Sequence, residues 1–186
     1  MYRIADDYEP TGSEEAAVLQ EFNSFRQALN VASADQRLLV LVDANEEVRE
    51  SLDATLSQVF AAPEVIGKFH LAFAESANED KGKEDWKTNI KGETTEKGVY
   101  IIRSGQFGLD GVVMQRLETT SDAETIQAAL LESNETFASD EERKVYKDHV
   151  RAGRRKRIYF ENEIPYGEDR DGDGKIDNAR GGRSRR

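Results

Sequence analysis

Nine residues near the C-terminus, Asp-Arg-Asp-Gly-Asp-Gly-Lys-Ile-Asp over 169–177, carry the most specific chemical pattern in the chain. Carboxylates at every second position can converge on one calcium ion, and the glycine that follows them permits a sharp turn. The next residue can add its backbone carbonyl oxygen, and a further acid can bind through water. The pattern therefore predicts a Ca²⁺ site with the ligands Asp169, Asp171, Asp173, Lys175 and Asp177.

The pattern resembles the calcium loop of EF-hand proteins, with Gly174 at the turn position. Position 12, where an EF-hand has a bidentate glutamate, is Arg180. Pro165 and Gly167 precede the loop and Gly181 follows it, so no helix pair is expected. The loop is more similar to single calcium loops of the dockerin or thrombospondin-repeat kind. We expect a weak site, with a dissociation constant of roughly 10⁻⁴–10⁻³ M, on a tail outside the folded domain. The simplest alternative is an acidic tail that keeps the chain in solution.

The amino-acid composition excludes several kinds of chemistry. The chain has no cysteine, which excludes disulfides, thiolate catalysis and cysteine-based zinc sites, and it has two histidines. Residues 1–150 hold 15 basic and 30 acidic residues, a net charge of −15, whereas residues 151–186 hold 11 and 7, a net charge of +4. The main body should therefore repel nucleic acid, and the basic charge lies in the C-terminal part.

Two features of the sequence bear on the location of the protein. No apolar run approaches the roughly 18 residues needed to span a membrane, and residues 1–7 lack the basic and apolar regions of a signal peptide. The same N-terminus would result if a methionine replaced a removed signal. Because a weak calcium site is useful only where calcium is millimolar, the loop favours a secreted or periplasmic location.

Hydrophobic periodicity predicts alternating helices and strands. A polar stretch over 75–97, around Trp86 and Ile90, reads as a long loop. The strands 99–103 and 111–117 are joined by a glycine-containing connection, so we expect an antiparallel hairpin. The predicted helices cover 21–34, 45–60, 122–132 and, with few apolar residues, 140–160; the other predicted strands cover 38–43 and 69–73.

The segment Leu41–Arg49 resembles the start of a response-regulator receiver domain. Such a domain should carry a second acid beside Asp43, where this chain has Ala44, and should continue as parallel strand–helix units. The predicted hairpin contradicts that continuation, and we reject this resemblance.

The order helix, strand, long helix, Ala-Pro-Glu-Val-Ile (62–66), strand, hairpin and helix resembles the thioredoxin fold over about residues 20–133. Residues 62–66 look like the segment after the first long helix in small thioredoxin-like domains of secreted bacterial proteins. The resemblance implies an α/β fold class, a thioredoxin-like three-layer α/β/α arrangement with a mixed sheet, plus a charged C-terminal extension. The expected organisation is an acidic leader (1–18), a thioredoxin-like domain (19–135), a charged helical extension (136–162) and a tail with the calcium loop (163–186).

The chain departs from this family at the redox site. The family's Cys-x-x-Cys would fall within 45–52, where there is no thiol, and its cis-proline would fall near Lys97-Gly98, where there is no proline. We therefore predict a redox-inactive, non-catalytic module with a binding or structural role and a protein partner.

Two other classes of function stay open. The basic segments Arg151–Arg157 and Arg183–Arg186 could make the chain an adaptor for nucleic acid or an acidic partner, although a solvated helix face that pairs with the acidic body is the preferred interpretation of the first segment. An enzyme site built from Asp43, Glu46 and Glu75 is the other class. Trp86 is expected to cover an edge of the core, and His70 is expected to be a packed or surface residue, not a base.

Overall fold

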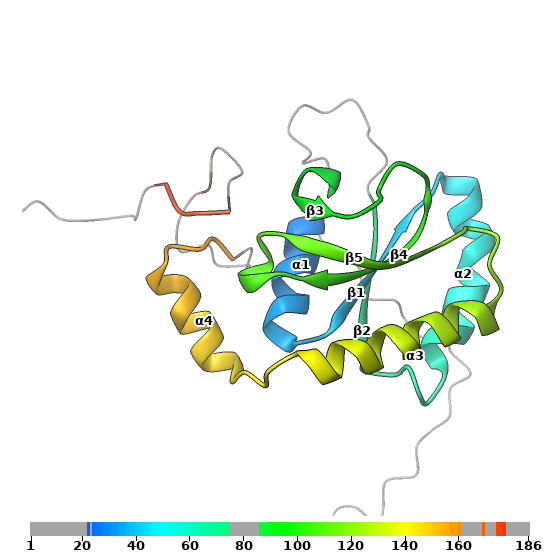
Figure 1. The fold of residues 1–186 in the computed structure, drawn as a ribbon. Helices are drawn as coiled ribbons and strands as arrows, with labels where there is room; N and C mark the ends of the chain where they lie inside the picture. Colours follow the sequence, from blue (N-terminus) through cyan, green and yellow to red (C-terminus); the bar gives the residue numbers. More distant parts are fainter. Residues whose placement is uncertain (1–21, 23, 75–85, 161–168, 170–173, 178–186) are drawn as a thin grey trace, which may run out of the picture.

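The computed structural model of the chain describes residues 22, 24–74, 86–160, 169 and 174–177. Over this part of the chain, helices alternate with the strands of one sheet (Figure 1). The elements are α1 (Phe25–Asp35), β1 (Leu38–Asp43), α2 (Glu46–Ala61), β2 (Phe69–Phe73), the 3-10 turn η2 (Trp86–Asn89), β3 (Ile90–Lys91), β4 (Gly98–Ser104), the 3-10 turn η3 (Gln106–Gly108), β5 (Gly111–Leu117), α3 (Ala123–Asp140) and α4 (Tyr146–Arg155).

The sheet is mixed and has five strands in the order β2-β1-β4-β5-β3. β1 runs parallel to β2 and antiparallel to β4, and β4 and β5 form the predicted antiparallel hairpin. In this register Val40 of β1 lies between Leu71 of β2 and Ile101 of β4. This topology confirms the α/β class with a mixed sheet, and it is compatible with a thioredoxin-like fold.

Helices cover both faces of the sheet, as Figure 1 shows, and β1 supplies the two hydrophobic cores. Leu38, Val40 and Val42 join one buried cluster with residues of α2 and α3, while Leu39 and Leu41 join the other with residues of α1. Since both faces of β1 are covered, its sequence is a continuous apolar run without polar alternation. The strand predicted at 38–43 is confirmed, with a layer of helices on each face of the sheet.

The first helix begins later than the sequence predicts. Ser24 has extended backbone angles and its side-chain oxygen accepts a hydrogen bond from the backbone N–H of Gln27 at 3.0 Å. Such a cap satisfies one of the N–H groups that a helix leaves unpaired at its start. The helix therefore starts at Phe25, and the apolar Phe22, which suggested an earlier start, precedes it.

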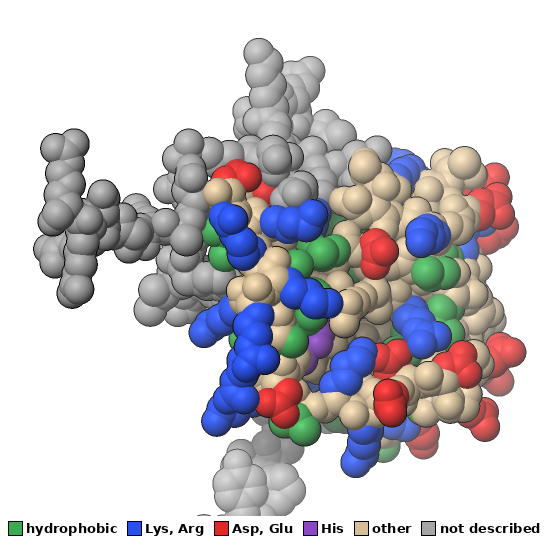
Figure 2. Space-filling view, turned by 60° about the vertical axis from the view of Figure 1, so that its left-hand side comes forward, with side chains coloured by type: hydrophobic (Ala, Val, Ile, Leu, Met, Phe, Trp, Pro, Cys, Tyr) green, Lys and Arg blue, Asp and Glu red, His purple; other side chains and the backbone are tan. Residues whose placement is uncertain are grey.

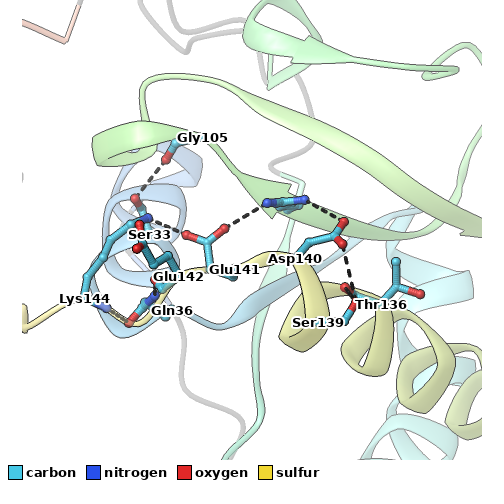
Figure 3. Close-up of polar contacts among 10 residues, drawn as sticks. Ser33, Gln36, Gly105, Thr136, Ser139, Asp140, Glu141, Glu142 and Lys144 are labelled. Carbon is cyan, nitrogen blue, oxygen red and sulfur yellow. Dashed lines mark hydrogen bonds and ion pairs between the residues drawn. The ribbon is translucent and has the colours of Figure 1, made fainter.

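The third helix is longer than predicted and the fourth is shorter. Polar contacts hold the residues between them, so that α4 begins later than predicted. Arg103 of β4 contacts Asp140 at 3.6 Å and Glu141 at 2.9 Å, just where α3 ends. The Gln36 amide donates to the Glu142 carbonyl and accepts from the Lys144 N–H, both at 2.7 Å. Figure 3 shows these contacts converging on the connection to α4.

Within the predicted loop over 75–97, residues 86–91 form secondary structure. Trp86 in η2 is buried, with its ring 5.0 Å from that of Tyr100 and 6.0 Å from that of Phe25. The next two residues, Ile90 and Lys91, form β3 beside β5. Trp86 thus covers the core, as predicted, and the two-residue strand was missed because it is too short to show a period.

Candidate functional site

The structure places Asp169 and Gly174–Asp177 of the predicted calcium loop, while Asp171 and Asp173 lie outside the described residues. The backbone N–H of Gly174 donates to Oδ2 of Asp169 at 2.9 Å. This bond joins the first predicted ligand to the turn position five residues later.

Two local constraints require glycine at position 174. Its φ is +80°, in the left-handed region that side chains other than glycine adopt at a cost. A Cβ atom here would also lie 2.3 Å from Nη1 of Arg26 in α1 and 2.3 Å from Cδ2 of Leu109, which precedes β5. Gly174 therefore packs against the domain, whereas the sequence predicts the loop on a tail outside it.

A short antiparallel ladder fastens the second half of the loop to the segment after α4. Tyr159 N–H donates to the Gly174 carbonyl at 2.9 Å, and Ile176 N–H donates to the Arg157 carbonyl at 2.7 Å. Lys175 pairs with Ile158 between these two bonds. In this non-hydrogen-bonded kind of pair, the backbone groups of both residues point away from the partner strand. The Lys175 carbonyl is thus directed away from the ladder, as a metal ligand at that position requires.

Arg157 closes the ladder with its side chain. Its guanidinium donates to the carbonyl of Ile176 at 2.6 Å and to that of Asp177 at 2.9 Å. These contacts tie the backbone of residues 176 and 177 to the segment that follows α4. The role of Arg157 has no sequence signal, because it depends on a contact between residues that are 19 and 20 positions apart.

A small apolar cluster, which includes Ile158 of the ladder, packs against α4. Phe107, Ile158 and Phe160 are buried together, and the His149 ring lies 4.9 Å from the Phe107 ring. Burial lowers the pKa of His149 from its usual 6.5, and the positive charge of Lys144 lowers it further. Within the described part of the chain, Nε2 of His149 has no hydrogen-bond partner, which fits a neutral ring.

The positions at which the thioredoxin resemblance would place a redox site, 45–52 and 97–98, make other contacts in this structure. Asn45 caps α2, where its side chain accepts from Val48 N–H at 3.3 Å. Asp43 lies opposite Gly98 in the sheet, and a Cβ atom at Gly98 would lie 2.5 Å from the carbonyl oxygen of Leu117. The described residues contain no cis peptide bond. Gly98 is thus closely packed, and the chain has no thiol.

The acids proposed for an enzyme site do not form a recognisable constellation where they are described. Asp43 forms an ion pair with Lys87 at 3.7 Å, Glu46 is an exposed residue in the first turn of α2, and Glu75 lies outside the described residues. Among the residues that the structure places, no group of three histidines, cysteines or acids could hold a metal ion. Asp171 and Asp173 lie outside these residues.

His70 has an acidic partner that sequence spacing did not indicate. Its Nε2 lies 3.1 Å from Oδ2 of Asp35, at the end of α1, and the Phe22 ring packs edge-on against it. Burial lowers the pKa of His70, and the Asp35 carboxylate opposes this in part. His70 is buried, as a packed residue, and the pair joins α1 to β2.

Comparisons with known proteins do not assign this chain to a family. No protein-family model, no curated protein and no solved structure matches the chain. In the described residues no helix is both long enough and apolar enough to cross a membrane. The site must therefore be interpreted from its own residues.

Proposed function

We propose that this chain is a redox-inactive, non-catalytic thioredoxin-like module in which a bound Ca²⁺ fastens the C-terminal segment to the sheet domain. The observation that carries the proposal is the hydrogen bond from Gly174 N–H to the Asp169 carboxylate, together with the left-handed φ of Gly174. A calcium loop needs this combination of a carboxylate and a tight turn.

The oxygen atoms available suit calcium. Asp169, Asp171, Asp173 and Asp177 would supply carboxylates and Lys175 its carbonyl, and calcium prefers hard oxygen ligands of this kind. Because the chain has Arg180 in place of a bidentate glutamate, the affinity should be low, with a dissociation constant of roughly 10⁻⁴–10⁻³ M.

In this proposal the bound ion stabilises the ladder between the loop and the segment after α4. Gly174 and Ile176 bond to Tyr159 and Arg157, which directly follow α4. An ion that orders the loop stabilises this pairing, since a ligand that binds only the docked state adds its binding free energy to docking. The absence of cysteine excludes thiol–disulfide exchange, so we assign the domain a binding or structural role.

Calorimetric titration with calcium tests the proposal. The full chain should bind one ion with the affinity given above, and a chain that ends at Glu161 should give no binding heat. The double variant Asp169→Asn/Asp171→Asn should lose binding. The matched control Asp53→Asn/Asp148→Asn, at exposed helix positions, should keep it. Absence of binding heat in the full chain would contradict the proposal.

A further inference from the structure

Helix α4 presents two contrasting faces. His149 and Gly153 are buried, and a Cβ atom at Gly153 would lie 2.5 Å from the ring of Phe160, so this face is closely packed. The opposite side carries four exposed cations at a spacing of four, three and one residues, which places them on one side of a helix. We call them the basic face: Lys147, Arg151, Arg154 and Arg155.

The basic face borders a shallow groove next to an exposed aromatic ring. Figure 2 shows Lys and Arg side chains gathered along the part of the surface that α4 forms. Tyr146, at the start of the helix, is 60% exposed. The groove has a volume of about 610 Å³ and is lined by Tyr146, Lys147, Val150, Arg151, Arg154 and Arg155.

The charge of this face is not cancelled within the helix. The single acid of α4 is Asp148, which lies 3.3 Å from Arg151 in an exposed i,i+3 pair. Pairs of this kind contribute little and are easily exchanged for another anion. Lys147, Arg151 and Arg155 against this one acid leave a positive strip on a chain whose net charge is −11.

We propose that the basic face binds single-stranded nucleic acid, with phosphates on the cations and one base stacked on Tyr146. Arginine supplies three of the four cations, and its planar guanidinium matches two phosphate oxygens at once. An exposed aromatic beside a cationic strip is the arrangement by which proteins bind single strands without sequence preference.

The charge distribution favours a single strand over broader polyanions. Residues 1–150 carry a net charge of −15, so a membrane or a duplex pressed against α4 would also approach the acidic body. A flexible single strand can follow the helix alone. An acidic peptide would satisfy the cations but would have no use for the exposed Tyr146 ring.

Fluorescence anisotropy with the full chain and a labelled single strand of about 12 nucleotides, a length within the usual site sizes, tests this proposal. We compare the variant Lys147→Glu/Arg151→Glu/Arg155→Glu with a control that has the same change in net charge at exposed sites away from α4, Lys68→Glu/Lys91→Glu/Lys97→Glu. The first should lose affinity at least tenfold, and the control should stay within about threefold of the unmodified chain. The logarithm of the association constant should fall with the logarithm of salt concentration with a slope of about −2 to −3 for three to four phosphates.

Tyr146→Ala tests the stacked base. It should weaken binding of the oligonucleotide about tenfold and leave binding of an abasic strand of equal length unchanged. The proposal is overturned if the intact chain does not bind at low salt, or if the variant of the basic face binds as well as the control. It is also overturned if anionic phosphatidylserine vesicles or poly-glutamate compete as well as the oligonucleotide does.

Discussion

Gly174 donates its backbone N–H to Oδ2 of Asp169 at 2.9 Å, while Asp169 lies five residues earlier in the chain. The same glycine packs against Arg26 and Leu109 of the domain and accepts a hydrogen bond from Tyr159. One residue thus connects the acidic loop to α1, to the β4–β5 connection and to the segment after α4. A change in the loop should therefore alter the free energy with which α4 docks on the domain.

Gly174→Ala should undock the loop. Alanine at φ +80° costs about 1–2 kcal/mol, and its Cβ would also overlap Arg26 and Leu109, so we expect a loss of at least about 2 kcal/mol in docking free energy. Amide hydrogen exchange of Tyr159 and Ile176 measures this loss.

Gly67→Ala is the matched control for that experiment. Gly67 has a similar φ of +74°, but a Cβ there meets no atom within 4 Å. It should cost about 1–2 kcal/mol of global stability through its backbone angle alone and leave the exchange of Tyr159 unchanged. Equal exchange of Tyr159 in both variants would show that Gly174 does not pack against the domain.

Docking of α4 should weaken in acid because of His149. Its pKa is lowered in the folded state, so the folded protein binds fewer protons than the unfolded chain as the pH falls below about 6.5. Stability is therefore full above that pH and falls as the pH decreases toward the lowered folded pKa. Denaturant unfolding at about pH 7.5 and pH 5.5 should give a smaller difference for His149→Leu than for the unmodified chain.

His70 contributes to the same pH dependence with the same sign, because burial lowers its pKa as well. His149→Leu should thus reduce the dependence without abolishing it, and His149→Leu/His70→Leu should reduce it further. A chain that is more stable at the acidic pH would contradict the assignment of both histidines as neutral in the folded state.

Gln36 should control how firmly the connection before α4 is held. Gln36→Ala removes the two 2.7 Å hydrogen bonds to Glu142 and Lys144. Since these bonds are exposed, we expect a loss of about 1 kcal/mol in the local stability of the connection. Gln58→Ala, at an exposed position of α2, is the control. Faster amide exchange of Lys144 in the first variant alone is the predicted result.

The sheet could be predicted from sequence because its strands are marked by their own residues. The continuous apolar run of β1 requires two covered faces, and the connection between β4 and β5 contains the glycines of a hairpin turn. The end of α3 could not be predicted in this way. Its polar last turns show no clear apolar period, and Arg103 of a distant strand helps to fix where the helix stops.

For the candidate loop, too, some features could be predicted from sequence and others could not. Its predicted ligands and the need for glycine at 174 follow from spacing, because one ion and one turn would impose them locally. Its docking does not follow from sequence, since Arg157 reaches the carbonyls of Ile176 and Asp177 only in the folded chain. The partnership of His70 with Asp35, 35 residues apart, was missed for the same reason.

The most direct test of the calcium-fastened loop is amide hydrogen exchange of Tyr159 and Ile176 during a calcium titration of the full chain. Both amides donate across the ladder, so their protection should rise with a midpoint of roughly 10⁻⁴–10⁻³ M calcium. Magnesium at the same concentrations should have little effect, and Asp169→Asn should abolish the response. Protection that is the same with calcium and with a chelator would contradict the account.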